Sequence, residues 1–202
     1  NGLELMRNHG DDIERHIADQ CLDILQNVHR ELDFYQGLQQ AYETVANAEP
    51  ETPVDELRRR SMLAFAGVFE DTRYRIRGEE NLPEQPGNII IMNHLENHAD
   101  TMLPNDFRIT LDSHFVASMI LFPCYGEAPI RVVRKPAEGW YGYQQYFDRL
   151  EYIYVYPGDI DEEDSDRHID RIDRTRLFLE TAAGYLRAGR NVVIAPEGHC
   201  SY

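Results

Sequence analysis

The apolar residues between positions 11 and 45 recur at intervals of three and four, which is the period of an amphipathic helix. They are Ile13, Ile17, Cys21, Ile24, Val28, Tyr35, Leu38, Tyr42 and Val45. We expect Gly37 to divide this stretch into two helices, which would form a hairpin packed on the rest of the chain or a seam between two copies. A platform for a membrane or a carrier protein is the alternative, although its acidic polar face disfavours it.

Two further helices are predicted from local signals at their ends. Over residues 53–70, Thr52 suits the N-cap and Pro53 the first helical position. Over residues 175–188 the pattern is amphipathic, and Gly189 follows it as a residue that favours helix C-termini. Both helices would turn an apolar side toward a core.

Short apolar runs bounded by turn residues predict β-strands between these helices. Ile89, Ile90 and Ile91 read as a buried strand, and the other candidates are 73–77, 129–134, 152–156 and the start of 190–201. Residues 114–122 suit a buried strand or a short helix closed by Pro123. The alternation predicts an α/β fold, a mixed sheet flanked by helices with an N-terminal helical hairpin or extension.

The length of 202 residues suits one α/β domain over 51–202, preceded by a helical extension over 1–50. The chain begins without methionine and stops soon after its last predicted strand. We therefore expect a fragment or processed chain that is truncated at its C-terminus.

The net charge of −16 disfavours nucleic-acid partners, because a phosphate backbone requires a basic protein face. It disfavours strongly anionic membranes as well. No apolar run approaches the ~20 residues of a membrane span, and no signal peptide is visible. The three cysteines lack metal-ligand spacing, so reduced thiols are expected. These features predict a cytoplasmic protein whose contact with membranes, if it has any, is peripheral.

Polar residues follow the predicted strand 89–91 directly, and they include His94, His98 and Asp100. The carboxyl ends of strands carry the functional side chains of open α/β sheets. A histidine oriented by a carboxylate is the minimum equipment for general-base catalysis. His94 is therefore the candidate base, and the structural alternative is that His94 and Asp100 only cap a helix.

Glu197 and Gly198 follow the last predicted strand in the same way. Together with Asn93, His94 and Asp100 they resemble the glycerolipid acyltransferase family, which includes lysophosphatidate and glycerol-phosphate acyltransferases. That family carries Asn-His, four residues and Asp in its first block, and Pro-Glu-Gly-Thr-Arg-Ser in its third. As a set in this order the motifs are fairly specific, although each is weak alone.

Two lead-in segments extend the resemblance. Residues 78–83 resemble the Gly-x-Glu-Asn-Leu-Pro stretch that precedes the first block, and residues 186–198 resemble the approach to the third. The resemblance spans about residues 74–201.

The resemblance implies an O-acyltransferase of phospholipid biosynthesis. His94 would take the proton from an acceptor hydroxyl, which attacks an acyl thioester directly, and Asp100 would hold the imidazole in the required tautomer. The acceptor would be a glycerol phosphate or a lysophospholipid. No metal or other cofactor is implied, since coenzyme A or an acyl carrier protein brings the acyl group as co-substrate.

The resemblance also implies substrate-binding residues. Arg134, with Arg131 as the fallback, matches the arginine at the end of the family's second block. Glu197, Gly198 and Ser201 match positions of its third block.

The chain departs from the family pattern at three places. The second block is ambiguous: residues 129–134 supply the arginine at the expected distance from His94, whereas residues 152–157 lie nearer the expected distance from Glu197 but have Pro157 where the arginine would be, and we favour Arg134. Five residues separate His94 from Asp100 instead of four, which on one continuous helix would set the side chains about 240° apart. His199, Cys200 and Ser201 stand where the family has Thr-Arg-Ser, so the phosphate-binding arginine of the third block is missing.

Other functions remain open. A non-phosphate acceptor would suit the missing arginine, and a non-catalytic lipid-binding relative would suit all the departures. His94, His98 and Asp100, with Glu197, could instead hold a metal ion in a hydrolase. A thioesterase would need a nucleophile, for which Cys200 or Ser201 beside His199 is the only hint.

Overall fold

The computed structural model describes residues 2–95, 101–136, 139, 141–156 and 171–196. Contacts within the chain divide it into two compact units, Asn1–Gly37 and Leu38–Tyr202. Residues 38–50, which we assigned to the helical extension, therefore belong to the unit that contains the sheet.

The first unit is a helical hairpin. Helix α1 (Gly2–His9) turns at Gly10 into α2 (Asp12–Ala46). Asp11 Oδ1 accepts hydrogen bonds from the N–H groups of Ile13 and Glu14, and Glu14 Oε2 accepts one from Asp11 N–H. This reciprocal pair is a capping box, which satisfies N–H groups that the first turn of α2 leaves without helical partners.

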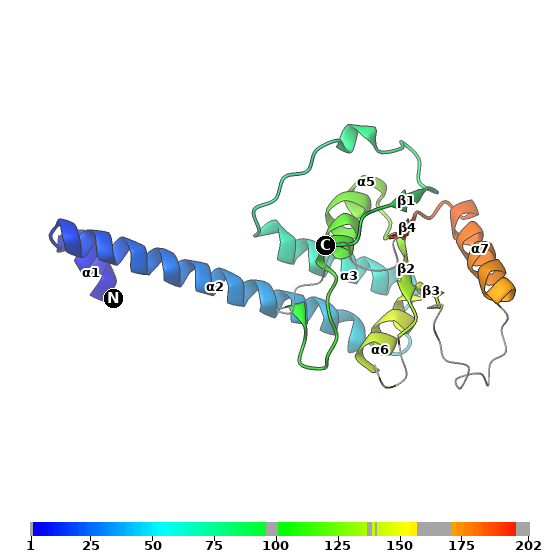
Figure 1. Ribbon diagram of the computed structural model, residues 1–202, viewed down its shortest axis with the longest axis horizontal. Coiled ribbons are helices and arrows are strands. Elements are labelled where there is room, and N and C mark those ends of the chain that lie inside the picture. Colours follow the sequence, from blue (N-terminus) through cyan, green and yellow to red (C-terminus); the bar gives the residue numbers. More distant parts are fainter. Residues whose placement is uncertain (1, 96–100, 137–138, 140, 157–170, 197–202) are drawn as a thin grey trace. The chain divides into compact units, whose positions relative to one another are not determined.

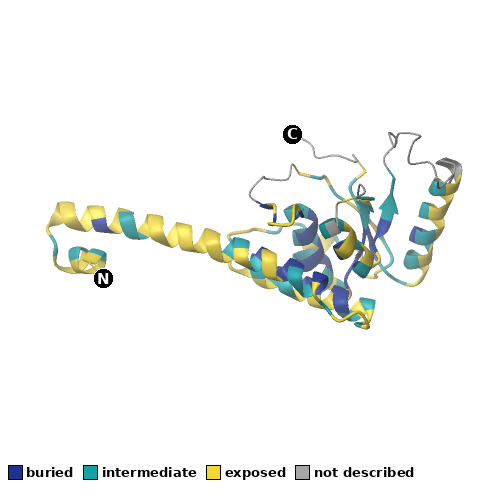
Figure 2. Ribbon diagram, turned by 90° about the horizontal axis from the view of Figure 1, so that it is seen from below, coloured by how far each residue is buried: buried dark blue, intermediate teal, exposed yellow. Residues whose placement is uncertain are grey.

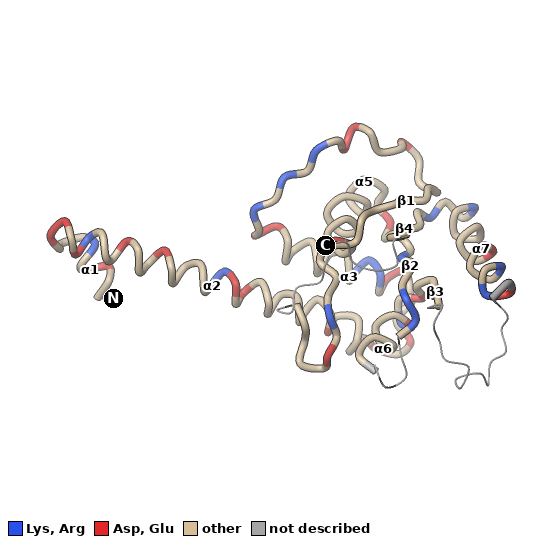
Figure 3. Tube along the Cα trace, viewed as in Figure 1, with Lys and Arg blue, Asp and Glu red and all other residues tan. Residues whose placement is uncertain are grey.

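Helix α2 runs without interruption through Gly37, so the predicted division at that residue is wrong. A glycine inside a helix costs only about 1 kcal/mol relative to alanine. Burial of Leu38, Tyr42 and Val45 in the second unit offsets that cost. In the first unit most of the apolar positions of α2 are exposed (Figure 2), and acidic residues outnumber basic ones along the helix (Figure 3).

The second unit is built on a parallel sheet of four strands in the order β1-β4-β2-β3 (Figure 1). The strands are β1 (Ile89–Ile91), β2 (Ile130–Arg134), β3 (Ile153–Val155) and β4 (Val192–Ile194). All four were predicted, and the α/β class with helices around a sheet is confirmed. The sheet was expected to be mixed, and the pairings among its described strands are all parallel. Residues 73–77, also predicted as a strand, form neither helix nor strand.

Helix α7 (Arg171–Arg187) packs on one face of the sheet and ends before Gly189, whose φ is +77°. Its Ala182 meets Ile130, Ile153 and Val192 in a buried cluster. The register places Ile89 and Ile91 on the same face, yet both are exposed. The prediction that this strand is buried is wrong for these two residues, because β1 is the edge strand and α7 packs over β3 and β4.

The opposite face is covered by helices that come from three parts of the chain (Figure 1). They are α3 (Val54–Glu70), α4 (Leu111–Phe115), the π-helical segment η3 (Val116–Leu121), α5 (Phe122–Tyr125) and α6 (Tyr141–Leu150). Helix α3 follows Pro53, one residue later than predicted. Residues 114–122 lie in α4, η3 and α5 and are helical, which is the second of the two predicted alternatives.

Pro123 does not close this helical segment. It lies in α5, which continues directly from the π-helical segment η3, and the helical segment ends only at Gly126, whose φ is +71°.

Asn191 joins three strands at the amino-terminal edge of the sheet. Its side-chain Oδ1 accepts hydrogen bonds from the N–H groups of Gly87 (3.0 Å) and Asn88 (2.9 Å). Its main-chain oxygen accepts one from Ile130 N–H at 2.8 Å. The side chain is buried, so one amide fixes where β1 enters the sheet beside β4.

Asn191→Ala should lower the free energy of unfolding by about 1–3 kcal/mol, because it leaves two N–H groups without their acceptor. Denaturant unfolding would measure the change. The exposed Asn27→Ala is the control and should change stability by less than about 0.5 kcal/mol. Equal effects of the two substitutions would show that the Asn191 bonds contribute nothing.

Candidate catalytic site

His94 lies just beyond the carboxyl end of β1. The strand pairing extends to Met92, whose N–H donates to the carbonyl oxygen of Ile194. The His94 side chain is 22% exposed, and its Nδ1 lies 2.7 Å from Oδ2 of Asp112. The candidate base is thus paired with a carboxylate that comes from the first turn of α4.

The side chain of Asp112 is largely buried, with 8% of it exposed. Its Oδ2 also accepts a hydrogen bond from Leu95 N–H at 2.7 Å, and its Oδ1 accepts one from Ser113 N–H at 2.6 Å. Burial alone would raise the pKa of Asp112, but the bonds from His94, Leu95 and Ser113 outweigh it and hold that pKa below its usual value. The carboxylate is therefore ionised at neutral pH.

An ionised carboxylate can only accept hydrogen bonds. Nδ1 of neutral His94 must therefore carry the proton that is donated to Asp112, and Nε2 carries the lone pair. This is the tautomer that a general base requires, with the carboxylate placed to stabilise the imidazolium that forms.

Packing of the preceding loop fixes the position of α4. Residues 101–109 form a small hairpin in which Leu103 N–H donates to Phe107 O and Ile109 N–H to Thr101 O. Phe107 and Ile109 are fully buried. The hairpin leads directly into Thr110, which precedes α4, so the core holds the turn that carries Asp112.

The hairpin is also tied to two helices of the second unit. Asn105 Nδ2 donates to the hydroxyl of Tyr42 at 2.8 Å, and Tyr143 OH accepts from Arg108 N–H at the same distance. Phe107 packs among the rings of Tyr42 and Tyr146, with centroids 4.6 and 5.0 Å away.

Arg131 projects from β2 toward the α4 side of the sheet and is buried, with 5% of it exposed. Its Nη2 donates to the hydroxyls of Thr110, at 2.9 Å, and Ser113. Its Nη1 lies 2.9 Å from Nε2 of His114. The guanidinium also lies over the ring of Tyr152 at 5.3 Å.

His114 is held as a neutral imidazole. Its Nδ1 lies 2.7 Å from the carbonyl oxygen of Thr110, which can only accept, so Nδ1 carries the proton. Its Nε2 is then free of a proton and accepts from Arg131. Burial lowers the pKa of His114 well below 6.5, and the charge of Arg131 lowers it further, while the Thr110 bond acts in the opposite direction.

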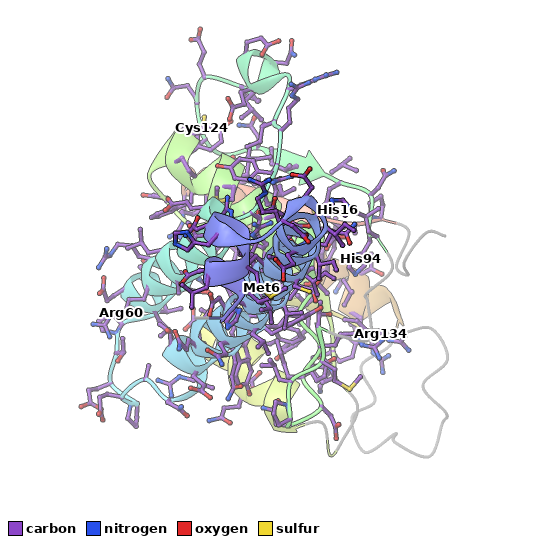
Figure 4. All side chains as sticks on the ribbon, turned by 90° about the vertical axis from the view of Figure 1, so that its left-hand side faces the viewer. Met6, His16, Arg60, His94, Cys124 and Arg134 are labelled. Atoms are coloured by element: carbon purple, nitrogen blue, oxygen red, sulfur yellow. The ribbon has the colours of Figure 1, made fainter. Side chains whose placement is uncertain are left out.

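Arg134 ends β2 and is exposed. Because β4 lies between β1 and β2, the carboxyl ends of these two parallel strands are about 10 Å apart, two strand spacings, at one edge of the sheet. His94 and Arg134 both follow or end strands at that edge (both are labelled in Figure 4). Of the two arginines predicted to bind substrate, Arg134 faces solvent and Arg131 does not.

The other predicted site residues lie outside the described residues: Asp100, Glu197, Gly198 and Ser201. The same holds for His98 of the metal alternative. Within the described residues no group of three or more His, Cys, Asp or Glu side chains could hold a metal ion. Pro196, the last described residue before Glu197, follows β4 between β1 and β2.

Asp112 was not among the predicted site residues. It lies eighteen residues after His94, so no local spacing connects the two. The sequence signal that was available is the largely polar stretch from Thr110 to His114 ahead of an apolar run. If residues 114–122 are taken as a helix, this stretch is its N-terminal turn.

No protein-family model, no curated protein and no solved structure matches this chain. None of the helices in the described ranges combines the length and the apolar character that crossing a membrane requires. The geometry around His94 is therefore the basis for any assignment of function.

Stability should fall as the pH falls from 7 to 5. The unfolded chain protonates His114 with a pKa near 6.5, while the folded protein resists that protonation, so the unfolded state binds more protons. The contribution is complete above pH 6.5 and is lost below it, with a slope of at most ~1.4 kcal/mol per pH unit. The lowered pKa of Asp112 acts only nearer pH 4.

His114→Gln should flatten this slope when denaturant unfolding is measured at several pH values. His16→Gln, at an exposed position, is the control and should keep the wild-type slope. An unchanged slope in His114→Gln would contradict the assignment of a neutral buried imidazole.

Proposed function

We propose that this chain is an O-acyltransferase that moves a fatty acyl group from an acyl thioester to a hydroxyl acceptor. The observation that carries the proposal is the 2.7 Å contact between His94 Nδ1 and the ionised Asp112 carboxylate at the carboxyl end of a parallel strand. The resemblance of the blocks around His94 and Glu197 to glycerolipid acyltransferases supports the choice of reaction.

In the proposed reaction His94 Nε2 takes the proton of the acceptor hydroxyl. The oxygen attacks the thioester carbonyl carbon, a C–O bond forms, and the C–S bond breaks. The imidazolium returns its proton to the departing thiolate, so the products are an ester and a thiol. Asp112 stabilises the imidazolium while it exists. The thioester is a co-substrate on coenzyme A or an acyl carrier protein.

A glycerol phosphate or lysophospholipid is the proposed acceptor. Its phosphate requires a cation near the base, and Arg134 is the exposed arginine at the same sheet edge. Glu197, Gly198 and Ser201 remain predicted substrate contacts from the family resemblance. A cytoplasmic enzyme of phospholipid biosynthesis with peripheral membrane contact fits this substrate class.

Two competing functions remain from the sequence. A neutral hydroxyl acceptor is favoured by the missing arginine of the third block, at Cys200. A metal-dependent hydrolase would use His94, His98 and Asp100 as ligands. Incubation with acyl thioesters, with and without phosphate and neutral acceptors and with a chelator, separates these functions by whether thiol release requires an acceptor or a metal.

His94→Ala should lower kcat by at least about 10²-fold, the usual contribution of a general base. Thermal unfolding should stay near wild type, because the side chain is partly exposed. Activity within a few-fold of wild type in a folded variant would remove the proposal. Acyl transfer measured as thiol release and ester formation provides the readout.

Asp112→Asn should lower kcat to a similar extent, because an asparagine amide permits the wrong imidazole tautomer. Asp100→Asn is the matched variant, since the family resemblance gives that residue the same role. A large loss in Asp112→Asn with a smaller one in Asp100→Asn is expected. A larger loss in Asp100→Asn than in Asp112→Asn would show that Asp100, and not Asp112, orients the His94 imidazole.

Arg134→Ala, and also Arg134→Lys, should raise the Michaelis constant for a phosphate acceptor by about tenfold or more, because one bidentate ionic contact is lost. The Michaelis constant for the thioester should change little. Arg60→Ala, at an exposed position on α3, is the control. No difference between Arg134→Ala and Arg60→Ala would show that Arg134 does not bind the acceptor.

A further inference from the structure

The structure assigns Arg131 a positioning role: its buried guanidinium holds the turn that presents Asp112 to His94, and it does not bind substrate. This inference concerns the same site and rests on the proposed function for its kinetic consequence. Its structural part, the order of the His94 to Asp112 hydrogen bond, can be measured without any substrate.

The contacts of Arg131 surround Asp112 in sequence. Thr110 precedes Asp112 by two residues, while Ser113 and His114 follow it, and all three accept hydrogen bonds from Arg131. A guanidinium is planar and rigid, so three simultaneous bonds fix both the position and the orientation of the turn. Asp112 has no direct bond to Arg131 and takes its position from these neighbours.

The turn is additionally closed on itself. Thr110 Oγ1 and Ser113 Oγ lie 2.7 Å apart, and His114 Nδ1 donates to the carbonyl oxygen of Thr110. Nε2 of His114 lies 3.3 Å from the hydroxyl of Tyr146, which is fully buried. The arginine therefore connects the turn to β2, and His114 connects it to α6.

The bonds of Arg131 within the described residues are unusual for a buried arginine. Among the described residues no carboxylate lies within ion-pair distance of its guanidinium, and neutral groups accept its bonds. Burying a charge in this way is costly unless its donors are satisfied. Its planar set of donors satisfies three acceptors of one turn, which a methionine or a leucine could not do.

The same contacts argue against substrate binding by Arg131. With 5% of the residue exposed, a phosphate could reach the guanidinium only by displacing hydroxyls that fix the turn. Arg134, three residues later on the same strand, is exposed instead. The two arginines thus divide the roles that the sequence left open.

Arg131→Lys is the test, because lysine keeps the charge but cannot form three bonds in one plane. Arg58→Lys is the matched control: Arg58 is also buried, and its Nε and Nη2 donate to the carbonyl oxygens of Leu150 and Glu151, away from the turn. Both substitutions remove a buried arginine, so a loss of stability alone should be common to both.

The first readout is the Nδ1 proton resonance of His94 in protein with ¹⁵N-labelled histidine, identified by its absence from His94→Gln. We expect it to be lost or broadened by exchange in Arg131→Lys and kept in Arg58→Lys. A sharp, unshifted resonance in Arg131→Lys would overturn the inference.

The second readout is kinetic. Arg131→Lys should lower kcat by about tenfold or more, with the Michaelis constants of both substrates changed by less than about twofold, since a displaced base acts on the chemical step. A raised Michaelis constant for a phosphate acceptor with unchanged kcat would overturn the inference in favour of binding. If the wild type transfers no acyl group while the resonance behaves as expected, the proposed function fails and the positioning role stands.

Should Arg131→Lys not fold, the paired substitution Thr110→Val and Ser113→Ala removes the two hydroxyl acceptors on the turn and leaves the arginine and its bond to His114 in place. It should broaden or remove the same His94 resonance. Retention of a sharp resonance in this folded variant would equally overturn the inference.

Discussion

The position of β4 in the middle of the sheet is the constraint on which the candidate site depends. This strand, the last in sequence among the described residues, pairs with β1 on one side and β2 on the other. The carboxyl ends of β1 and β2 therefore take their places only when residues 192–194 have joined the sheet. Asn191 fixes this arrangement at the opposite edge, where its side chain and main chain hold the segments that enter β1 and β2. His94 and Arg134 share one edge because a strand about a hundred residues from His94 lies between them.

Much of this arrangement was predictable, because its signals are local. Short apolar runs bounded by turn residues identified all four strands, helical periodicity identified the region of α2, and signals at the helix ends identified α3 and α7. His94 was chosen as a candidate site residue because it follows β1, and open α/β sheets carry functional side chains at the carboxyl ends of their strands. The exposure of strand residues was harder to predict. Ile89 and Ile91 have the composition of a buried strand, but β1 lies at the edge of the sheet, where α7 does not cover it.

The partner of His94 was not predictable in the same way. A sequence shows the spacing of residues along one element, and Asp112 reaches His94 from a different element after a hairpin that carries no strong pattern. Arg131 was likewise predicted to bind substrate because it lies near the end of a strand, but the groups it contacts depend on the direction of its side chain. Residue 131 pairs with Val193 and so shares its face of the sheet, and that face is covered by α4. Which face a strand residue occupies follows from its register, and register is fixed only by the complete sheet.

The origin of the carboxylate bears on the unusual spacing after His94. When base and carboxylate lie on one helix, inserting a residue between them rotates one side chain by about 100° and separates the pair. A carboxylate supplied by α4 is independent of that spacing, because the core holds the 101–109 hairpin and the turn at Thr110 whatever the length of the segment between His94 and the hairpin. The five residues between His94 and Asp100 are then compatible with an oriented base. This arrangement needs more supporting contacts: the orientation of the proposed base His94 depends on Asp112, and Asp112 depends on the turn that we infer Arg131 to hold.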